Sequence, residues 1–426
     1  MTAQTLSCEL ENSVSLKMAK GLTNTQQEAL SEFRKNLSDI LTHYDTDAVL
    51  LKWLRARNFH VRKAEVYFRE FHAFKQVYQF DTIMETYRKP EIAEKYEYTS
   101  FLGLAKDGSI IRYCHIGKGD HNGFVMSMST FSCVMYCSHI LESDAILQRK
   151  ENDRTGRPMN EITYIFDMDG FSVADIMHKI VFEMALDLMH DVQDYYPEVW
   201  GNIFVINVPP YFDTVFNFIK PILQLSVIKK LQVLSRESVA ETLLKYIDDD
   251  VLPVFLGGKK VDSNNDPMCK EFLRFGGKVP KQYYLCNRTL LSPTDPEVKS
   301  LWIGPRYVHN HCIVSNKPGS TIKIEFRTEN GSIHLKILFR KMDGDKADVP
   351  SADEYLNERD EKTNVLLVSP GMRIQSHVSH VDETCKTPWP GIYIFRFDNG
   401  HSWFGSRRLI YRIRMIEPES DFVIVP

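Results

Sequence analysis

The first part of the chain carries apolar residues at helical spacing. Thr25 and Glu28 have the spacing of a capping box, which predicts that a helix begins there, and a second helical run follows Thr46. The pattern predicts a helical region over residues 23–80, preceded by a mixed polar segment at residues 1–22. The apolar positions that repeat at helical intervals in the first helix are Leu30, Phe33, Leu37 and Leu41.

Residues 88–260 alternate strand and helix signals. Two short continuous apolar runs, Tyr164-Ile165-Phe166 and Ile203-Phe204-Val205-Ile206, are typical of strands that are buried on both faces. A helical pattern lies between them, and strands that alternate with helices favour a parallel sheet with right-handed crossovers. The pattern therefore predicts an α/β domain.

The pattern changes after a polar linker at residues 259–267, and residues 275–416 show the alternation of an all-β region. Ile322, Ile324 and Phe326 alternate with charged residues. Asn330-Gly331 follows, a dipeptide typical of a two-residue turn that joins the two strands of a hairpin. Further strand patterns reach the end of this region, and they predict a β-sandwich.

Composition narrows the function. The formal net charge is −4, and no basic stripe with interleaved aromatics is present, so we expect no nucleic-acid partner. The eight cysteines have no regular spacing, and no apolar run has the length of a signal peptide or a spanning helix. No catalytic, cofactor or metal motif is evident. We expect a cytoplasmic protein, not an enzyme, that contacts membranes peripherally, without a cofactor or metal.

One segment points to a ligand. Pro209-Pro210 breaks the chain after a predicted strand, and 11 of the 18 residues from 211 to 228 are large and apolar. A helix that is apolar on more than one face is either a core helix or a cover over an apolar cavity. Glu198 and Lys230 flank the segment, and such charges require partners or a ligand headgroup. The apolar residues are Phe212, Val215, Phe216 and Ile219 on one face, and Phe218 and Ile222 on another.

Five short motifs stand out along the chain. They are Leu51-Lys52-Trp53-Leu54-Arg55-Ala56-Arg57, Phe166-Asp167-Met168-Asp169-Gly170, Tyr195-Tyr196-Pro197-Glu198, Asn207-Val208-Pro209-Pro210 and Leu252-Pro253-Val254-Phe255-Leu256-Gly257-Gly258. Together they resemble the CRAL-TRIO lipid-transfer family, in the branch that carries a C-terminal GOLD domain. The resemblance covers about residues 25–416, and it implies helices, an α/β lipid-binding domain and a GOLD β-sandwich.

The resemblance implies a headgroup site at Arg57, Glu198 and Lys230. A phosphate suits the two cations, and inositol hydroxyls suit the carboxylate. A structural salt bridge is the alternative for Arg57. The family's gate helix matches about residues 211–220, so Phe212, Val215, Phe216, Phe218, Ile219 and Ile222 are the expected gate and pocket residues. This chain departs from the phosphoinositide pattern at Val227, where the family has threonine.

The resemblance implies a function in lipid transport. We expect the protein to bind phosphatidylinositol or a tocopherol-like or squalene-like isoprenoid in a gated apolar pocket, and to transfer or present it between membranes during transient contact. The alternative is a lipid-sensing signalling adaptor that acts through the GOLD domain without net transfer. A protein partner is expected on the sandwich, whose aromatics Trp389, Trp403 and Phe404 serve either as contacts or as core.

Overall fold

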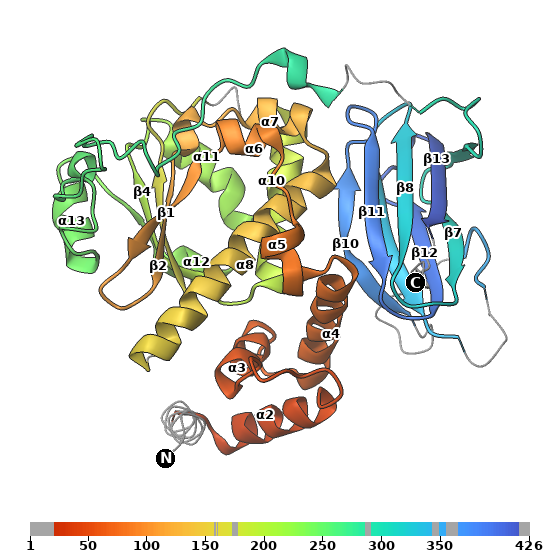
Figure 1. Ribbon diagram of the computed structural model, residues 1–426, viewed down its shortest axis with the longest axis horizontal. Coiled ribbons are helices and arrows are strands. Elements are labelled where there is room, and N and C mark those ends of the chain that lie inside the picture. Colours follow the sequence, from red (N-terminus) through yellow and green to blue (C-terminus); the bar gives the residue numbers. More distant parts are fainter. Residues whose placement is uncertain are drawn as a thin grey trace, which may run out of the picture. The chain divides into compact units, whose positions relative to one another are not determined.

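The structure, a computed structural model, describes residues 21–156, 159, 161–172, 178–285, 291–342, 349–354 and 365–416. Almost all of the polar segment expected at residues 1–22 lies outside these ranges. The chain forms two compact units (Figure 1). Unit 1 consists of Met1–Glu65, Lys89–Phe124 and Ser138–Pro280, and unit 2 consists of Val66–Arg88, Val125–Cys137 and Lys281–Pro426.

The described α-helices are α2 (Asn24–Asn36), α3 (Asp47–Ala56), α4 (Val61–Val77), α5 (Ile83–Thr86), α6 (Glu91–Tyr96), α7 (His121–Ser127), α8 (Thr130–Thr155), α10 (Lys179–Tyr195), α11 (Phe212–Ile219), α12 (Leu225–Lys230) and α13 (Val239–Tyr246). Among these residues no single helix is long and apolar enough to cross a membrane. Only α7 and α8 taken together, bent by 114°, pass the same criteria of length and composition.

The first helix begins two residues earlier than its sequence pattern predicts. Thr23 is the N-cap of α2, and it forms a complete capping box with Gln26. The amide of Gln26 donates to the Thr23 hydroxyl, and the amide of Thr23 donates to the Gln26 side chain. The prediction that Thr25 and Glu28 open the helix is wrong. Thr23 and Gln26 have the same spacing two residues earlier, and their side chains bond the free backbone amides at the start of α2. Helix α3 follows Thr46, as expected, although the Thr46 side chain makes no capping hydrogen bond.

Unit 1 is built on a mixed five-stranded sheet in the order β1-β2-β3-β4-β5. The first strand is antiparallel to its neighbour and the other pairs are parallel, which confirms the α/β prediction. In Figure 1, α13 covers one face of this sheet, and α8, α10 and α11 cover the other. The strands are β1 (Thr99–Leu104), β2 (Ile110–Cys114), β3 (Ile162–Asp167), β4 (Trp200–Ile206) and β5 (Leu231–Val233).

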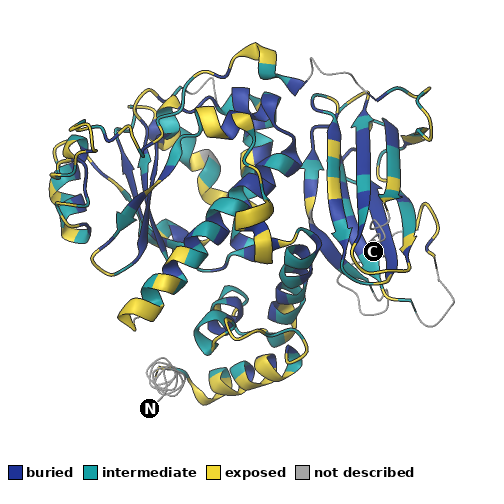
Figure 2. Ribbon diagram, in the orientation of Figure 1, coloured by how far each residue is buried: buried dark blue, intermediate teal, exposed yellow. Residues whose placement is uncertain are grey.

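Each face of this sheet has its own apolar core, because successive side chains on a strand point to opposite sides. On β4, Phe204 and Ile206 pack toward α13, whereas Ile203 and Val205 pack toward the opposite face. Strand β2 is therefore buried throughout, and β3 and β4 are buried at most of their positions (Figure 2). The second core, called here the α11-side core, includes Ile110, Cys114, Leu141, Ile162, Tyr164, Met168, Phe171, Ile203, Val205, Phe212 and Val227.

Unit 2 contains two four-stranded antiparallel sheets, which confirms the β-sandwich prediction. One sheet has the order β10-β9-β12-β7 and the other β11-β8-β13-β6. The strands are β6 (Lys299–Ile303), β7 (Val308–Ser315), β8 (Ser320–Thr328), β9 (Ile333–Arg340), β10 (Leu366–Ile374), β11 (Val381–Thr387), β12 (Gly391–Asp398) and β13 (Arg407–Ile416).

The hairpin predicted at Asn330-Gly331 is wrong. The turn exists, and Gly331 has the positive φ (70°) that favours glycine, but it connects β8 to β9, which belong to different sheets. The Asn330 amide donates to the carbonyl of Ser406, and its oxygen accepts from the amide of Arg408. Asn330 therefore ties the turn to β13 instead of closing a two-residue hairpin.

Helical segments of unit 2 pack against the sandwich at the edge where β10 and β11 lie. The ring of Tyr78 lies 4.9 Å from that of Phe131, and its hydroxyl donates to Ser369 on β10. Together with strand residues of both sheets, these rings line a small cavity of about 10 Å³, the size of one water molecule. The start of α8 also meets β11, where Glu383 accepts hydrogen bonds from the hydroxyls of Ser129 (2.8 Å) and Ser132 (3.1 Å).

Glu383 predicts an unusual pH dependence of stability. Burial raises the pKa of its carboxyl from 4.5 to about 7, and the two serine hydroxyls oppose that rise. Between these values the folded protein binds more protons than the unfolded chain, so stability falls as pH rises from about 4.5 to 7. The decrease is at most ~3 kcal/mol for a shift of this size.

Chemical unfolding of the wild type and of Glu383→Gln at a series of pH values measures this effect. The glutamine cannot ionise and keeps an oxygen that accepts from both serines, so its pH slope is expected to be smaller. Asp353→Asn, at an exposed carboxylate that is not among the groups acting on Glu383, is the control and should keep the wild-type slope. Equal slopes in the wild type and Glu383→Gln would contradict the prediction.

Candidate functional site

Helix α11 covers the α11-side core with one apolar face. Phe212 is buried, and Val215 and Phe216 are half-buried against that core. The rings of Phe212 and Phe216 stack at 5.8 Å. Asp213, Thr214 and Asn217 occupy the exposed face, and Ile219 is half-buried. The described side chains thus give the helix one polar face, while the side chains of Phe218 and Ile222 lie outside the described part.

Polar contacts at its two ends hold this segment. Before α11, the hydroxyl of Tyr211 donates to the carbonyl of Phe171 at 2.5 Å. After it, Pro221 ends the α-helix in a 3-10 turn over Lys220–Ile222, as its lack of an amide donor requires. The amide of Gln224 then donates to the side chain of Gln193 on α10 at 3.0 Å. The segment is therefore fixed at both ends by hydrogen bonds and in the middle by apolar packing.

The structure brings Glu198 and Lys230 into one charged cluster around Lys52. Glu198 lies 3.5 Å from Arg55, and Lys230 lies 2.9 Å from Glu161. All four of these charges act on Lys52. Burial, followed by the two cations, lowers the pKa of Lys52 to about 8, and the two carboxylates oppose that shift.

The backbone fixes both ends of this cluster. Glu198 has a left-handed backbone with φ 55°, which is uncommon for a residue with a side chain and holds it in one orientation before β4. The ammonium of Lys230 donates to the Trp200 carbonyl at 2.7 Å as well as to Glu161. Val227, one turn before Lys230 on α12, is buried in the α11-side core. The cluster therefore borders that core.

Arg57 has a different partner. Its guanidinium donates to the Asp194 carboxylate at 2.9 Å and to the Asp194 carbonyl at 3.3 Å, and its side chain is only 10% exposed. This contact joins the end of α3 to α10. The structure therefore places Glu198 and Lys230, two of the three expected headgroup residues, in the cluster around Lys52, and it places Arg57 in an ion pair with Asp194.

A buried ion pair lies on the same side of the sheet as the α11-side core. Arg112 alternates with Ile110 and Cys114 on β2, and its guanidinium makes two-pronged contact with Asp144 of α8 at 2.6–3.1 Å. Burial raises the pKa of the Asp144 carboxyl, and Arg112 opposes that rise. Asp144 is 1% exposed, so this pair links α8 to the sheet within a dry region.

Sequence reasoning missed Lys52 and the Arg112–Asp144 pair. Lys52 stands inside the Leu51–Arg57 motif and lies on α3 together with Arg55. Its signal was a lysine between buried apolar residues on a helix, since Leu51 and Trp53 are both buried. Asp144 offered no local signal, because its partner lies 32 residues away on a strand.

Comparisons with known proteins agree with this architecture. Residues 94–258 match the CRAL/TRIO domain family. The chain is also similar to Protein ctg-1 of Caenorhabditis elegans, with 24% identity over 396 residues that cover 92% of this chain and 97% of that protein. Among solved structures, the crystal structure of Sfh5 aligns with 61% of this chain and 90% of its own, at 18% identity and a TM-score of 0.39. That score is too low to bear on function.

The CRAL/TRIO match covers the whole sheet of unit 1, together with α11 and the cluster residues Glu161, Glu198 and Lys230. Proteins of this family bind and transfer lipids and are generally not enzymes. Lys52, Arg55 and Arg57 precede the matched residues, on the helices that come before the domain. The chain therefore contains a CRAL/TRIO domain at residues 94–258, with helices before it and an all-β region after it.

Proposed function

We propose that this protein carries a phosphoinositide, with the acyl chains against the α11-side core and the headgroup phosphate at the charged cluster. The observation that supports this ligand is the charge balance. Three cations, Lys52, Arg55 and Lys230, meet two carboxylates, Glu161 and Glu198. Because the cluster brings three cations together beside an apolar core, an anionic headgroup with long tails suits the site.

The size of the hydrophobic effect explains why such a carrier needs a cover. Each methylene removed from contact with water contributes about 0.8 kcal/mol, so a lipid with roughly 30 methylenes would cost ~24 kcal/mol to expose. A closed apolar space offsets that cost, and α11 supplies the movable wall. We propose that it opens at the membrane surface, where open and closed states exchange population.

Two alternatives differ from this proposal, one in the lipid that is bound and the other in what lipid binding brings about. A neutral tocopherol-like or squalene-like isoprenoid is favoured by the fact that Arg57, Lys230 and Glu198 each already have a charged partner. A sensing adaptor would bind the same lipid but report its presence through the C-terminal sandwich, which we propose is a GOLD domain. Both proposals, like the carrier, place the protein in the cytoplasm and on membranes peripherally.

Native mass spectrometry of the protein purified from eukaryotic cells, with analysis of the released lipid, tests the ligand. We expect one phosphoinositide per chain. A neutral isoprenoid in its place would assign the cluster a structural role. A folded protein that loads no lipid would refute the carrier, and lipid binding without vesicle-to-vesicle transfer would favour the adaptor.

Glu198→Ala with Lys230→Ala is expected to abolish phosphoinositide binding, because both partners of the headgroup are removed. The pH dependence gives a second readout. Lys52 loses its proton as pH rises through about 8, so wild-type affinity should fall between pH 7 and 9. Lys245→Ala, at an exposed cation on α13 outside both the cluster and the α11 segment, is the control. Unchanged affinity in a folded double variant would exclude the headgroup assignment.

A further inference from the structure

Four large aromatic side chains are exposed at one end of the C-terminal sandwich. Trp302 is 63% exposed, Tyr307 66%, Trp403 69% and Phe404 96%. They come from β6 and from the loops β6–β7 and β12–β13, which lie at the same end because β13 pairs with β6. Exposed apolar groups gathered in this way mark an interaction site. We call these four residues the aromatic tip.

The aromatic tip rests on a rigid base. The fully buried Asn399 side chain donates to the carbonyls of Ile303, Gly304 and Gly405, so a single amide ties the two loops together. Its backbone also exchanges hydrogen bonds with Arg306 and Tyr307. A loop held by this many bonds keeps its aromatics exposed as part of its folded structure.

Cations accompany the aromatics. The guanidinium of Arg306 lies 4.5 Å from the ring centre of Trp403 and donates to the Gly400 carbonyl. Arg407, at the foot of the same loop, donates to carbonyl oxygens of Ser332, Gly405 and Ser406. In the described part of the chain neither arginine forms an ion pair with a carboxylate, so both charges are available to an anionic partner.

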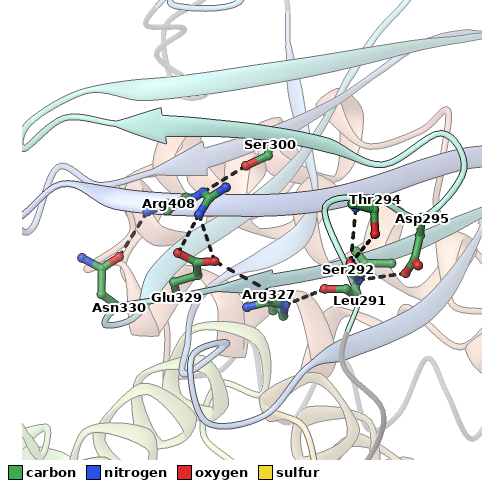
Figure 3. Close-up of polar contacts among 9 residues, drawn as sticks. All are labelled: Leu291, Ser292, Thr294, Asp295, Ser300, Arg327, Glu329, Asn330 and Arg408. Carbon is green, nitrogen blue, oxygen red and sulfur yellow. Dashed lines mark hydrogen bonds and ion pairs between the residues drawn. The ribbon is translucent and has the colours of Figure 1, made fainter.

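The charges next to the tip also favour an anion. Arg408, the cross-strand partner of Trp302, contacts Glu329 at 3.1 Å, and Arg327 approaches the same carboxylate at 4.0 Å (Figure 3). Two arginines therefore share one carboxylate. Together with Arg306 and Arg407, they give this end of the sandwich an excess of positive charge around exposed aromatic rings.

We propose that the aromatic tip docks the protein on an anionic phospholipid bilayer. Tryptophan and tyrosine favour the headgroup level of a membrane, phenylalanine enters the acyl region, and arginine pairs with lipid phosphate. At 96% exposure Phe404 projects beyond its neighbours, which suits insertion into a soft surface better than a peptide held in a groove. The proposal rests on the proposed function in one respect, since a lipid carrier must reach a membrane.

The test is flotation of the full chain with vesicles of phosphatidylcholine and phosphatidylserine, and with pure phosphatidylcholine vesicles. Trp403→Ser with Phe404→Ser should weaken binding to the mixed vesicles about tenfold. Arg306→Gln should weaken it about fivefold on the mixed vesicles, with little change on pure phosphatidylcholine. Ile416→Ser, 51% exposed at the other end of β13, is the matched control and should bind as the wild type does.

Unchanged flotation of the double variant overturns the proposal, as does a wild type that binds neither vesicle. Equal losses in Ile416→Ser and the double variant also overturn it, because the contact would then not be specific to the tip. Lipid loading, measured by native mass spectrometry on the same variants, separates this result from the proposed function. A double variant that loads lipid normally but no longer floats supports docking by the aromatic tip. A wild-type protein that loads no lipid but floats, and stops floating in the double variant, also supports docking by the tip but refutes the proposed lipid carrier.

Discussion

Replacing Asp144 with leucine is expected to destabilise unit 1 by about 3–5 kcal/mol. The change leaves the Arg112 guanidinium 8% exposed without its carboxylate, and a buried charge without a partner is among the most costly defects in a fold. Arg112 lies on the central part of the sheet and Asp144 on α8, so the loss also detaches a helix from the wall of the α11-side core.

The double variant Arg112→Met with Asp144→Leu is the decisive control. Well-packed apolar side chains often replace a buried ion pair at little cost, so the double variant should be more stable than Asp144→Leu alone. Equilibrium unfolding in urea, followed by tryptophan fluorescence, measures all three proteins and Arg112→Met. A double variant that loses the sum of the two single losses would show that the ion pair contributes no coupling.

The fold class could be predicted because its signals are local. The runs Tyr164–Phe166 and Ile203–Ile206 are short and continuously apolar, as expected of strands with both faces covered, and each forms an inner strand of the sheet. The alternation of Ile322, Ile324 and Phe326 likewise reports a sandwich strand with one buried face. The positions of apolar residues along a strand indicate which of its faces are buried, so this feature could be predicted from the sequence.

The pairing of strands could not be predicted in the same way. Asn330-Gly331 has the chemistry of a tight turn, but whether the following strand pairs with the previous one depends on partners elsewhere in the chain. Here β8 pairs with β11 and β13, which lie more than fifty residues further on. β8 therefore has both of its neighbours in its own sheet, and the Asn330-Gly331 turn leads from this sheet to β9 in the other one.

The candidate site shows the same contrast between local signals, which could be predicted, and contacts between distant residues, which could not. Glu198 and Lys230 were named as the charges that flank the apolar segment and from the family resemblance. The structure brings them together around Lys52, to which the sequence analysis gave no role. Arg57 was named from the same source, and it lies with Asp194. A motif states which residues recur at a position, whereas the charge balance around a side chain depends on helices and strands that meet only in the folded chain.

Helix α11 gives the second large expected effect. Phe216→Asp should lower the rate of lipid transfer between vesicles by about tenfold to a hundredfold, which corresponds to ~1–3 kcal/mol for an unpaired polar group facing an apolar core. Phe216 packs on that core and stacks on Phe212, so a carboxylate there would disfavour the closed state that we propose for the lipid carrier.

Asn217→Asp is the matched control for this helix, since it adds the same charge one residue further on, where the side chain is exposed. It should transfer lipid at the wild-type rate. Both variants should fold, and Phe216→Asp should lose at most the ~1–3 kcal/mol that the polar group costs, because hydrogen bonds also hold the two ends of the α11 segment. Fluorescent-lipid transfer between donor and acceptor vesicles measures the rate. If Phe216→Asp and Asn217→Asp transfer lipid equally well, α11 is a fixed wall of the core, and the opening that admits the lipid lies elsewhere in unit 1.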